Sequence, residues 1–254
     1  MPSELVVGPN RFAVGLLHDD GSIVPAQRVQ LTYYDLSNSA QPVVESDAEA
    51  TRLATPDNDV VIWAHQRDFA RAGDWGVQVR ATQQDGSLLT RNIAFSVDSD
   101  SSSLLPGEAA PRVDSPTLAS VDDDLSRLTS ASTPDREMYT QSIAEALDSG
   151  RPTLVLFATP AYCQTRFCGP DYEIARQLRE TWGAALNVIH IEVYSGLPNP
   201  VANNFELAPA MTAFGVATEP WLYLIDADGV VTYRVEGLFT YAEVDSQISA
   251  LLGQ

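Results

Sequence analysis

The sequence of 254 residues predicts two domains, an all-β domain of the β-sandwich class followed by an α/β domain. Residues 1–97 contain short segments in which apolar and polar residues alternate, with turn signals between them. Residues 133–254 instead alternate between helix-like and strand-like patterns. Between the two, residues 98–132 are acidic and rich in serine and proline. This middle segment predicts a linker, or a partly extended arm that lies over the next domain.

The first domain shows its clearest strands near its start and at its end. Apolar residues alternate over 12–16 and 29–33. The segment 75–97 reads as a hairpin, because Gln84-Asp85-Gly86-Ser87 forms a tight turn between two alternating runs. The stretch 72–79 resembles the late strand of immunoglobulin-like modules in bacterial surface proteins. That resemblance implies an immunoglobulin-like sandwich, here with no cysteines to brace it.

The second domain is predicted from helix caps and apolar runs. Thr133 caps a helix that begins at Pro134 and ends before Gly150. An apolar strand at 153–158 is followed by a helix that Pro170 opens and Gly183 closes. The remaining elements each have a signal of their own: a strand at 186–193, a short helix near 209–214, two strands on either side of Ala227-Asp228-Gly229, and a last helix with a Thr240–Glu243 capping box.

Cys163 and Cys168 are the only cysteines of the chain, and they stand five positions apart between the strand at 153–158 and the next helix. A thiol just before a helix faces unpaired backbone N–H groups and the positive end of the helix dipole, which favour the thiolate. Two thiols in one short loop can also close a disulfide, provided that at least one of them lies off the helix. The pattern predicts a redox site with Cys163 and Cys168 as its catalytic pair.

The order of these elements resembles the thioredoxin fold over about residues 134–254. The resemblance rests on the segments 157–163, 167–170 and 214–220, and on Gly237 after the last strand. It implies a cis peptide bond before Pro220. It also implies that Glu219 and Pro220 form the second wall of the site, where the backbone pairs with an extended substrate.

Two residues of the cysteine loop complete the predicted substrate-binding set. Tyr162 directly precedes the first cysteine, and Arg166 lies between the two. A positive charge beside a thiol lowers its pKa, so Arg166 is also expected to favour the thiolate.

The sequence departs from the family pattern in two respects. Family oxidoreductases carry Cys-x-x-Cys, whereas the spacing here is Cys-x4-Cys. The buried acid that shuttles protons in thioredoxin corresponds to Leu156. Two registers stay open: either Cys163 is the attacking residue, or Cys168 is, with Asp171 in place of the second cysteine.

Three functional hypotheses follow from these residues. The first is a thiol–disulfide oxidoreductase that needs no cofactor and acts on a protein partner bearing a thiol or a disulfide. The second is a non-catalytic binding module whose disulfide braces the loop. The third is copper handling of the Sco type, in which a distant histidine joins the two cysteines. The chain offers His18, His65 and His190, and His190 is expected to be a core residue because it lies in an apolar strand.

Composition excludes several other classes. The chain has 34 acidic and 15 basic residues, a net charge of −19, which disfavours nucleic acid and anionic lipid as partners. It has no lysine, which excludes Schiff-base chemistry and a P-loop. No apolar run approaches the ~20 residues of a membrane span, and Met1-Pro2-Ser3 does not begin a signal peptide. The expected location is the cell surface or the extracellular space, after removal of a signal or of an anchor, which would be the protein's link to a membrane.

Overall fold

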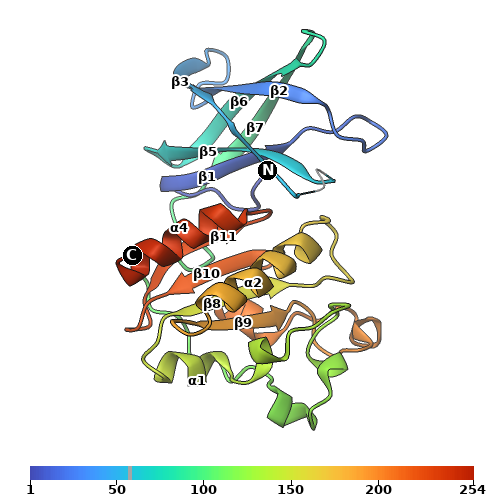
Figure 1. Ribbon diagram of the computed structural model, residues 1–254. Helices are drawn as coiled ribbons and strands as arrows, with labels where there is room; N and C mark the ends of the chain where they lie inside the picture. Colours follow the sequence, from blue (N-terminus) through green and yellow to red (C-terminus); the bar gives the residue numbers. More distant parts are fainter. Residues whose placement is uncertain (57–58) are drawn as a thin grey trace. The chain divides into compact units, whose positions relative to one another are not determined.

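The computed structural model describes residues 1–56 and 59–254 and divides into two compact units, Met1–Ser101 and Ser102–Gln254. The first unit is all β and the second is α/β (Figure 1). Over these described residues, no helix combines the length and the apolar character that crossing a membrane requires.

The first unit consists of two antiparallel sheets. One has the strand order β1-β5-β4 and the other β3-β2-β6-β7. Apolar residues from both sheets share one core, in which the Phe69 and Trp75 rings meet edge to face with centroids 5.1 Å apart. The strands are β1 (Gly8–Gly15), β2 (Ala26–Asp35), β3 (Val43–Glu49), β4 (Thr51–Ala54), β5 (Val61–Phe69), β6 (Gly73–Gln83) and β7 (Leu88–Val97).

The sequence indicated β1, β2 and the β6–β7 hairpin but not the three strands between them. Strand β3 is mostly exposed and acidic, so it lacks the alternating apolar residues by which a strand is recognised. Strand β4 has only four residues. Both are held by their pairing with β2 and β5, which a local pattern does not reveal.

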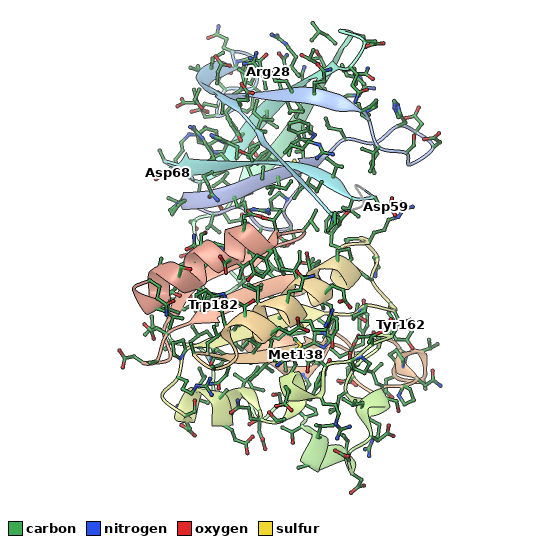
Figure 2. The ribbon with its side chains drawn as sticks, in the orientation of Figure 1. Arg28, Asp59, Asp68, Met138, Tyr162 and Trp182 are labelled. Atoms are coloured by element: carbon green, nitrogen blue, oxygen red, sulfur yellow. The ribbon has the colours of Figure 1, made fainter. Side chains whose placement is uncertain are left out.

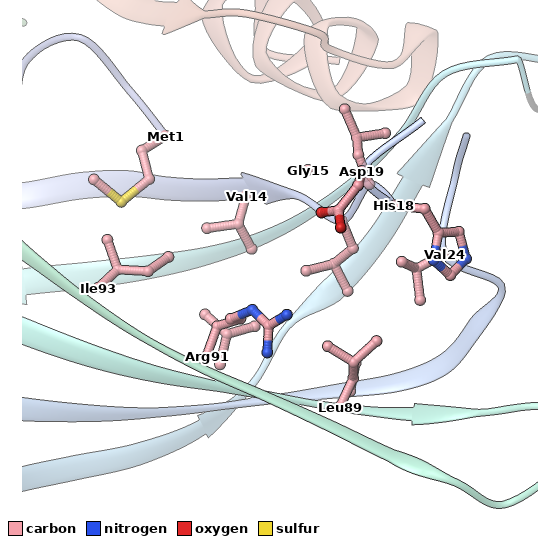
Figure 3. A pocket seen from close by; sticks show the side chains of 13 residues that line it. Met1, Val14, Gly15, His18, Asp19, Val24, Leu89, Arg91 and Ile93 are labelled. Atoms are coloured by element: carbon pink, nitrogen blue, oxygen red, sulfur yellow. The ribbon is translucent and has the colours of Figure 1, made fainter. Parts of the chain in front are cut away.

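The first unit also contains a pocket of about 370 Å³ (Figure 3). Val14, Val79 and Ala81 line it and belong at the same time to the shared core. His18 and Arg91 add polar groups to the lining. The pocket therefore has core residues on one side, and exposed residues such as Leu17 and His18 at its surface.

The second unit is built on a four-stranded sheet with the order β11-β10-β8-β9. The central strand β8 (Thr153–Ala158) pairs in parallel with β9 (Asn187–Glu192) and antiparallel with β10 (Trp221–Ile225). Strand β11 (Val231–Glu236) pairs antiparallel with β10. All residues of β8, β9 and β10 are buried, as expected of strands covered on both faces.

Helices cover the two faces of this sheet (Figure 1). Helices α2 (Cys168–Trp182) and α4 (Tyr241–Leu252) pack on the face that carries Leu154 and Leu222. Helices α1 (Ile143–Asp148) and α3 (Pro209–Ala213) pack on the face that carries Phe157. The second unit therefore has the thioredoxin-like α/β fold that the sequence predicted.

Two predicted helices differ in their bounds. The helix expected from Pro134 to Gly150 is divided into the 3-10 helix η3 (Arg136–Tyr139) and α1. The reason is a second start signal, because the Ser142 hydroxyl accepts the Glu145 N–H group and caps α1. Helix α2 begins at Cys168, two residues before the proline that was expected to open it.

Residues 102–132 lie within the second unit, as an arm that packs on its core. The arm contains the short 3-10 helices η1 (Leu118–Val121) and η2 (Leu125–Arg127). Val121 and Leu128 are buried in the same cluster as the inner face of α2. The second unit thus begins at Ser102, well before residue 133, because apolar residues scattered through the polar segment reach the core.

Replacement of Leu128 by alanine tests whether the arm is part of the core. Leu128 is 5% exposed, so Leu128→Ala should lower the free energy of unfolding of the second unit by about 2–5 kcal/mol. The change is measured by urea unfolding, monitored by near-ultraviolet circular dichroism. The control is Val201→Ala, since Val201 is 60% exposed and its loss should cost less than about 0.5 kcal/mol. Equal effects of the two substitutions would contradict a packed arm.

Candidate functional site

The candidate site lies in the loop between the end of β8 and the start of α2. Tyr162 N–H donates to the Thr159 carbonyl over 3.1 Å, which turns the chain as it leaves the strand. Arg166 has a positive φ of 67°, a conformation in which the chain changes direction again before the helix. Because of these two turns, Cys163 lies next to the first residue of α2, Cys168, although five positions separate the two cysteines in the sequence.

The two cysteines lie together at the N-terminus of α2, both as thiols. Cys168 is the first residue of the helix and is fully buried, whereas Cys163 is partly exposed. The Cys168 N–H group donates to the Cys163 sulfur over 3.4 Å, and the Thr165 hydroxyl lies 3.3 Å from the same sulfur. The more accessible sulfur therefore receives hydrogen bonds at the positive end of a helix of 15 residues.

This geometry gives the two thiols different acidities. The Cys168 thiol donates to the Cys163 sulfur, and this bond, with those from Thr165 and from the backbone, lowers the pKa of Cys163 to about 5 in spite of burial. The same bond and burial raise the pKa of Cys168 far above that of an ordinary thiol. Hydrogen bonds are thus the main cause that lowers the pKa of Cys163. The side chain of Arg166, whose charge the sequence suggested for this effect, is exposed.

The predicted second wall lies beside the cysteine loop. The peptide bond between Glu219 and Pro220 is cis, as the resemblance implied. The Glu219 carboxylate accepts the Gln164 N–H group over 3.4 Å, which joins this wall to the cysteine loop. Burial raises the pKa of Glu219, and the nearby Cys163 charge acts in the same direction.

An apolar patch borders the loop on the side of Tyr162. The Tyr162 hydroxyl donates to the Pro198 carbonyl over 3.2 Å, and its ring meets the Phe205 ring edge to face with centroids 6.2 Å apart. Figure 2 shows Tyr162 at the surface of the second unit. Among the large apolar side chains that the structure describes in this unit, Val201 and Phe205 are the exposed ones, at 60% and 42%. We call Tyr162, Val201 and Phe205 the apolar patch.

Glu192 is a site residue that sequence reasoning missed. It is the last residue of β9, is 6% exposed, and stands opposite Ala158 at the end of β8. Burial raises its pKa to about 7, and the charge of Cys163 adds to this shift. The family pattern places its acid within 153–158, where this chain has Leu156. The available signal was a glutamate at the end of a strand parallel to β8, since the carboxyl ends of parallel strands meet at one edge of a sheet.

The alternative register, with Cys168 as the attacking residue and Asp171 in place of a second cysteine, has less support in the geometry. Asp171 is fully buried in the first turn of α2, and its carboxylate accepts the Phe239 N–H group over 3.4 Å. It therefore holds the segment before α4 in place. The Cys168 sulfur is covered, which leaves Cys163 as the thiol that a visiting molecule can reach.

The histidine of this unit is a core residue. The His190 Nδ1 atom lies 2.8 Å from the Tyr139 hydroxyl, and Nε2 lies 3.0 Å from the Ala158 carbonyl oxygen. Complete burial lowers its pKa to about 4. Both ring nitrogens are thus engaged in hydrogen bonds, and His18 and His65 belong to the first unit. Across residues 1–56 and 59–254, no three His, Cys, Asp or Glu side chains gather as a metal ion would require.

Comparison with known proteins finds similarity to solved structures. A putative thiol:disulfide interchange protein DsbE from Chlorobium tepidum superposes with a TM-score of 0.43 at 17% identity, over 59% of this chain and 99% of that one. A thioredoxin family protein from Chlorobium tepidum TLS, described as a thiol:disulfide interchange protein, gives 0.40 at 20% identity, over 59% and 98%. A DsbH oxidoreductase gives 0.29 at 17% identity, over 48% and 87%. No protein-family model and no curated protein matches the chain.

The lowered pKa of Cys163 is open to direct titration. The ultraviolet absorbance of the thiolate in the reduced protein should rise with a midpoint near pH 5. Cys168→Ala removes the main hydrogen-bond donor and should move that midpoint upward, whereas Cys163→Ser should abolish the transition. A midpoint in the ordinary thiol range, near pH 8–9, would contradict the hydrogen bonds to the Cys163 sulfur.

Proposed function

We propose that the second unit is a thiol–disulfide oxidoreductase in which Cys163 is the nucleophile and Cys168 the resolving cysteine. The observation that carries the proposal is the asymmetry of the pair. Cys163 is accessible and has a pKa of about 5, so it is a thiolate at neutral pH. Cys168 is buried behind it and stays protonated until it reacts. Thiol–disulfide exchange needs these two states, a thiolate that attacks the partner first and a second thiol that stays protonated until the resolving step.

The reaction proceeds in two exchanges. The Cys163 thiolate attacks one sulfur of a partner disulfide, a bond forms between them, and the other partner sulfur leaves as a thiolate. Cys168 then loses its proton, its sulfur attacks the Cys163 sulfur, and the second partner sulfur leaves. The partner disulfide gains two electrons, and Cys163 and Cys168 become a disulfide. The same steps in reverse oxidise a partner dithiol.

Glu192 is the proposed acceptor of the Cys168 proton. A buried carboxyl with a pKa of about 7 is poised to take and to release a proton at neutral pH. Glu192 also lines a pocket of about 240 Å³, together with Arg127 and Ser195. This pocket supplies a route by which the proton leaves the site. Glu192 would thus replace the acid that the chain lacks at Leu156.

The proposed partner is a protein that presents a disulfide or a thiol in an extended segment. Glu219 and Pro220 offer the wall against which the segment lies. The apolar patch, beginning at Tyr162, offers a surface for an apolar side chain next to the partner cysteine, because exposed apolar groups clustered beside a reactive atom favour contact with a protein. Arg166, exposed in the same loop, is available to a carboxylate of the partner.

The first unit is proposed to be an immunoglobulin-like module that presents or spaces the redox unit outside the cytoplasm. Its order of β1-β5-β4 in one sheet and β3-β2-β6-β7 in the other supports this assignment, since such modules pair antiparallel sheets across one core. The location follows from the resemblance to modules of bacterial surface proteins.

Trapping the intermediate tests the proposed mechanism. Cys168→Ser should leave the first exchange intact and halt the second, so that a mixed disulfide between Cys163 and the partner accumulates and is detected by intact-protein mass spectrometry. Cys163→Ser should form no adduct and should lose insulin-reducing activity.

The reduction potential separates catalysis from a permanent disulfide. A catalytic pair should have a potential in the range of known oxidoreductases, whereas a value below about −300 mV would indicate a structural bridge and overturn the proposal. A titration against glutathione or dithiothreitol buffers provides the measurement.

The apolar patch can be tested through substrate size. Phe205→Ala should raise the KM for a protein disulfide about fivefold or more, the effect of an interface side chain worth ~1 kcal/mol, and should leave the rate with a small aromatic disulfide unchanged. The matched control is Leu88→Ala, an exposed apolar residue of the first unit. If Phe205→Ala slows both substrates alike, the patch does not recognise a protein.

A further inference from the structure

Ser130, on the arm, makes hydrogen bonds in two directions. Its N–H group donates to Glu192 Oε2 over 2.8 Å, and its hydroxyl lies 3.1 Å from both carboxylate oxygens. The same hydroxyl accepts the Ala161 N–H group over 3.0 Å. Ala161 lies two residues before Cys163, in the loop that turns the chain toward α2.

These bonds fix the orientation of the hydroxyl. Because Ser130 Oγ accepts from Ala161, its own hydrogen is free to point to the Glu192 carboxylate. One small side chain therefore connects the end of β9 to the cysteine loop, although the two lie 62 and 31 residues away from it in the sequence.

The arm holds Ser130 firmly. The two preceding residues, Leu128 and Thr129, are both 5% exposed. The Thr129 hydroxyl accepts the Ala131 N–H group over 3.1 Å, which closes a turn around Ser130. The position of the hydroxyl is thus set by the packing of the arm.

We propose that Ser130 is a positioning residue of the thiol site, which holds the Glu192 carboxylate and the cysteine loop in the relative places that thiol–disulfide exchange uses. This inference rests on the proposed function, and it makes the arm part of the redox machinery. Ser130 acts on the two sulfurs through its hydrogen-bond partners, Glu192 and Ala161.

The Ser130 hydroxyl lowers the pKa of Glu192. Hydrogen bonds from the Ser130 side chain and backbone favour the charged form of Glu192 and oppose the effect of burial on its pKa. Without the hydroxyl, Glu192 loses one of the donors that stabilise its charge, and it is protonated over a wider range of pH.

Other titratable groups face Glu192 and Cys163 from the neighbouring elements. Tyr139 on η3 and the Cys163 thiolate lie close enough to interact electrostatically with the Glu192 carboxylate. Glu219 and Tyr194 interact in the same way with Cys163. All of these groups are retained when the Ser130 hydroxyl is removed, so a shift in the titration of Glu192 reports the loss of that hydroxyl.

The test uses the full chain and three variants. Ser130→Ala removes the hydroxyl, Ser130→Thr keeps it, and Ser126→Ala is the matched control, because Ser126 is an exposed arm residue whose hydroxyl contacts Asp124. The readouts are the rate at which the second thiol of a small aromatic disulfide is released as a function of pH, which reports the resolving step, and the carboxyl infrared signal that Glu192→Gln removes. Circular dichroism and thermal unfolding check that each variant is folded.

We expect Ser130→Ala to slow the resolving step about tenfold at neutral pH, the effect of one lost hydrogen bond to a charged group. Because Glu192 acts as the base, the rising limb of the pH profile and the Glu192 infrared titration should both move to higher pH. Ser130→Thr should restore both, and Ser126→Ala should match the wild type. A folded Ser130→Ala variant with wild-type profile and infrared titration would overturn the inference and leave the proposed function standing. If the wild type itself shows no exchange that depends on Cys163, the proposed function fails, and the infrared titration still decides whether Ser130 sets the state of Glu192.

Discussion

The hydrogen bonds that Cys168 directs at the Cys163 sulfur are the interaction on which the candidate site depends. Its thiol and its N–H group both donate to that sulfur, at the positive end of α2. They stabilise a negative charge on the accessible cysteine and at the same time hold the proton on the buried one. A spacing of five residues, which would separate two cysteines on a regular helix, is compatible with this contact because the first cysteine lies in the loop.

The sheet of the second unit supplies the rest of the site through strand pairing. Strand β8 is central, with β9 on one side and β10 on the other. The end of β9 therefore places Glu192 beside the cysteine loop, and the start of β10 places the cis bond of Glu219 and Pro220 there as well. Three segments that are distant in the sequence converge because parallel and antiparallel neighbours of one strand share its edge.

The arm shows how a polar, proline-containing segment can be structural. Its few apolar residues, such as Val121 and Leu128, bury themselves against the same core as α2, and the nearby Ser130 reaches Glu192. Composition averaged over the segment left two interpretations open, a linker or an arm over the next domain, since the buried residues are sparse and follow no helical or strand period. The structure has the arm.

The sequence by itself determined the two-part organisation, the order of helices and strands from 153 to the C-terminus, and the place of Cys163 and Cys168 before a helix, because apolar runs and helix caps are local signals. The cis bond at Pro220 was expected only through the resemblance to the thioredoxin fold, and the structure has it. The tertiary structure alone decided which cysteine is exposed, the direction of each pKa shift, and the position of Glu192 and Ser130 beside the cysteine loop. Those properties depend on burial and on hydrogen bonds between residues up to 62 positions apart, which no local pattern records.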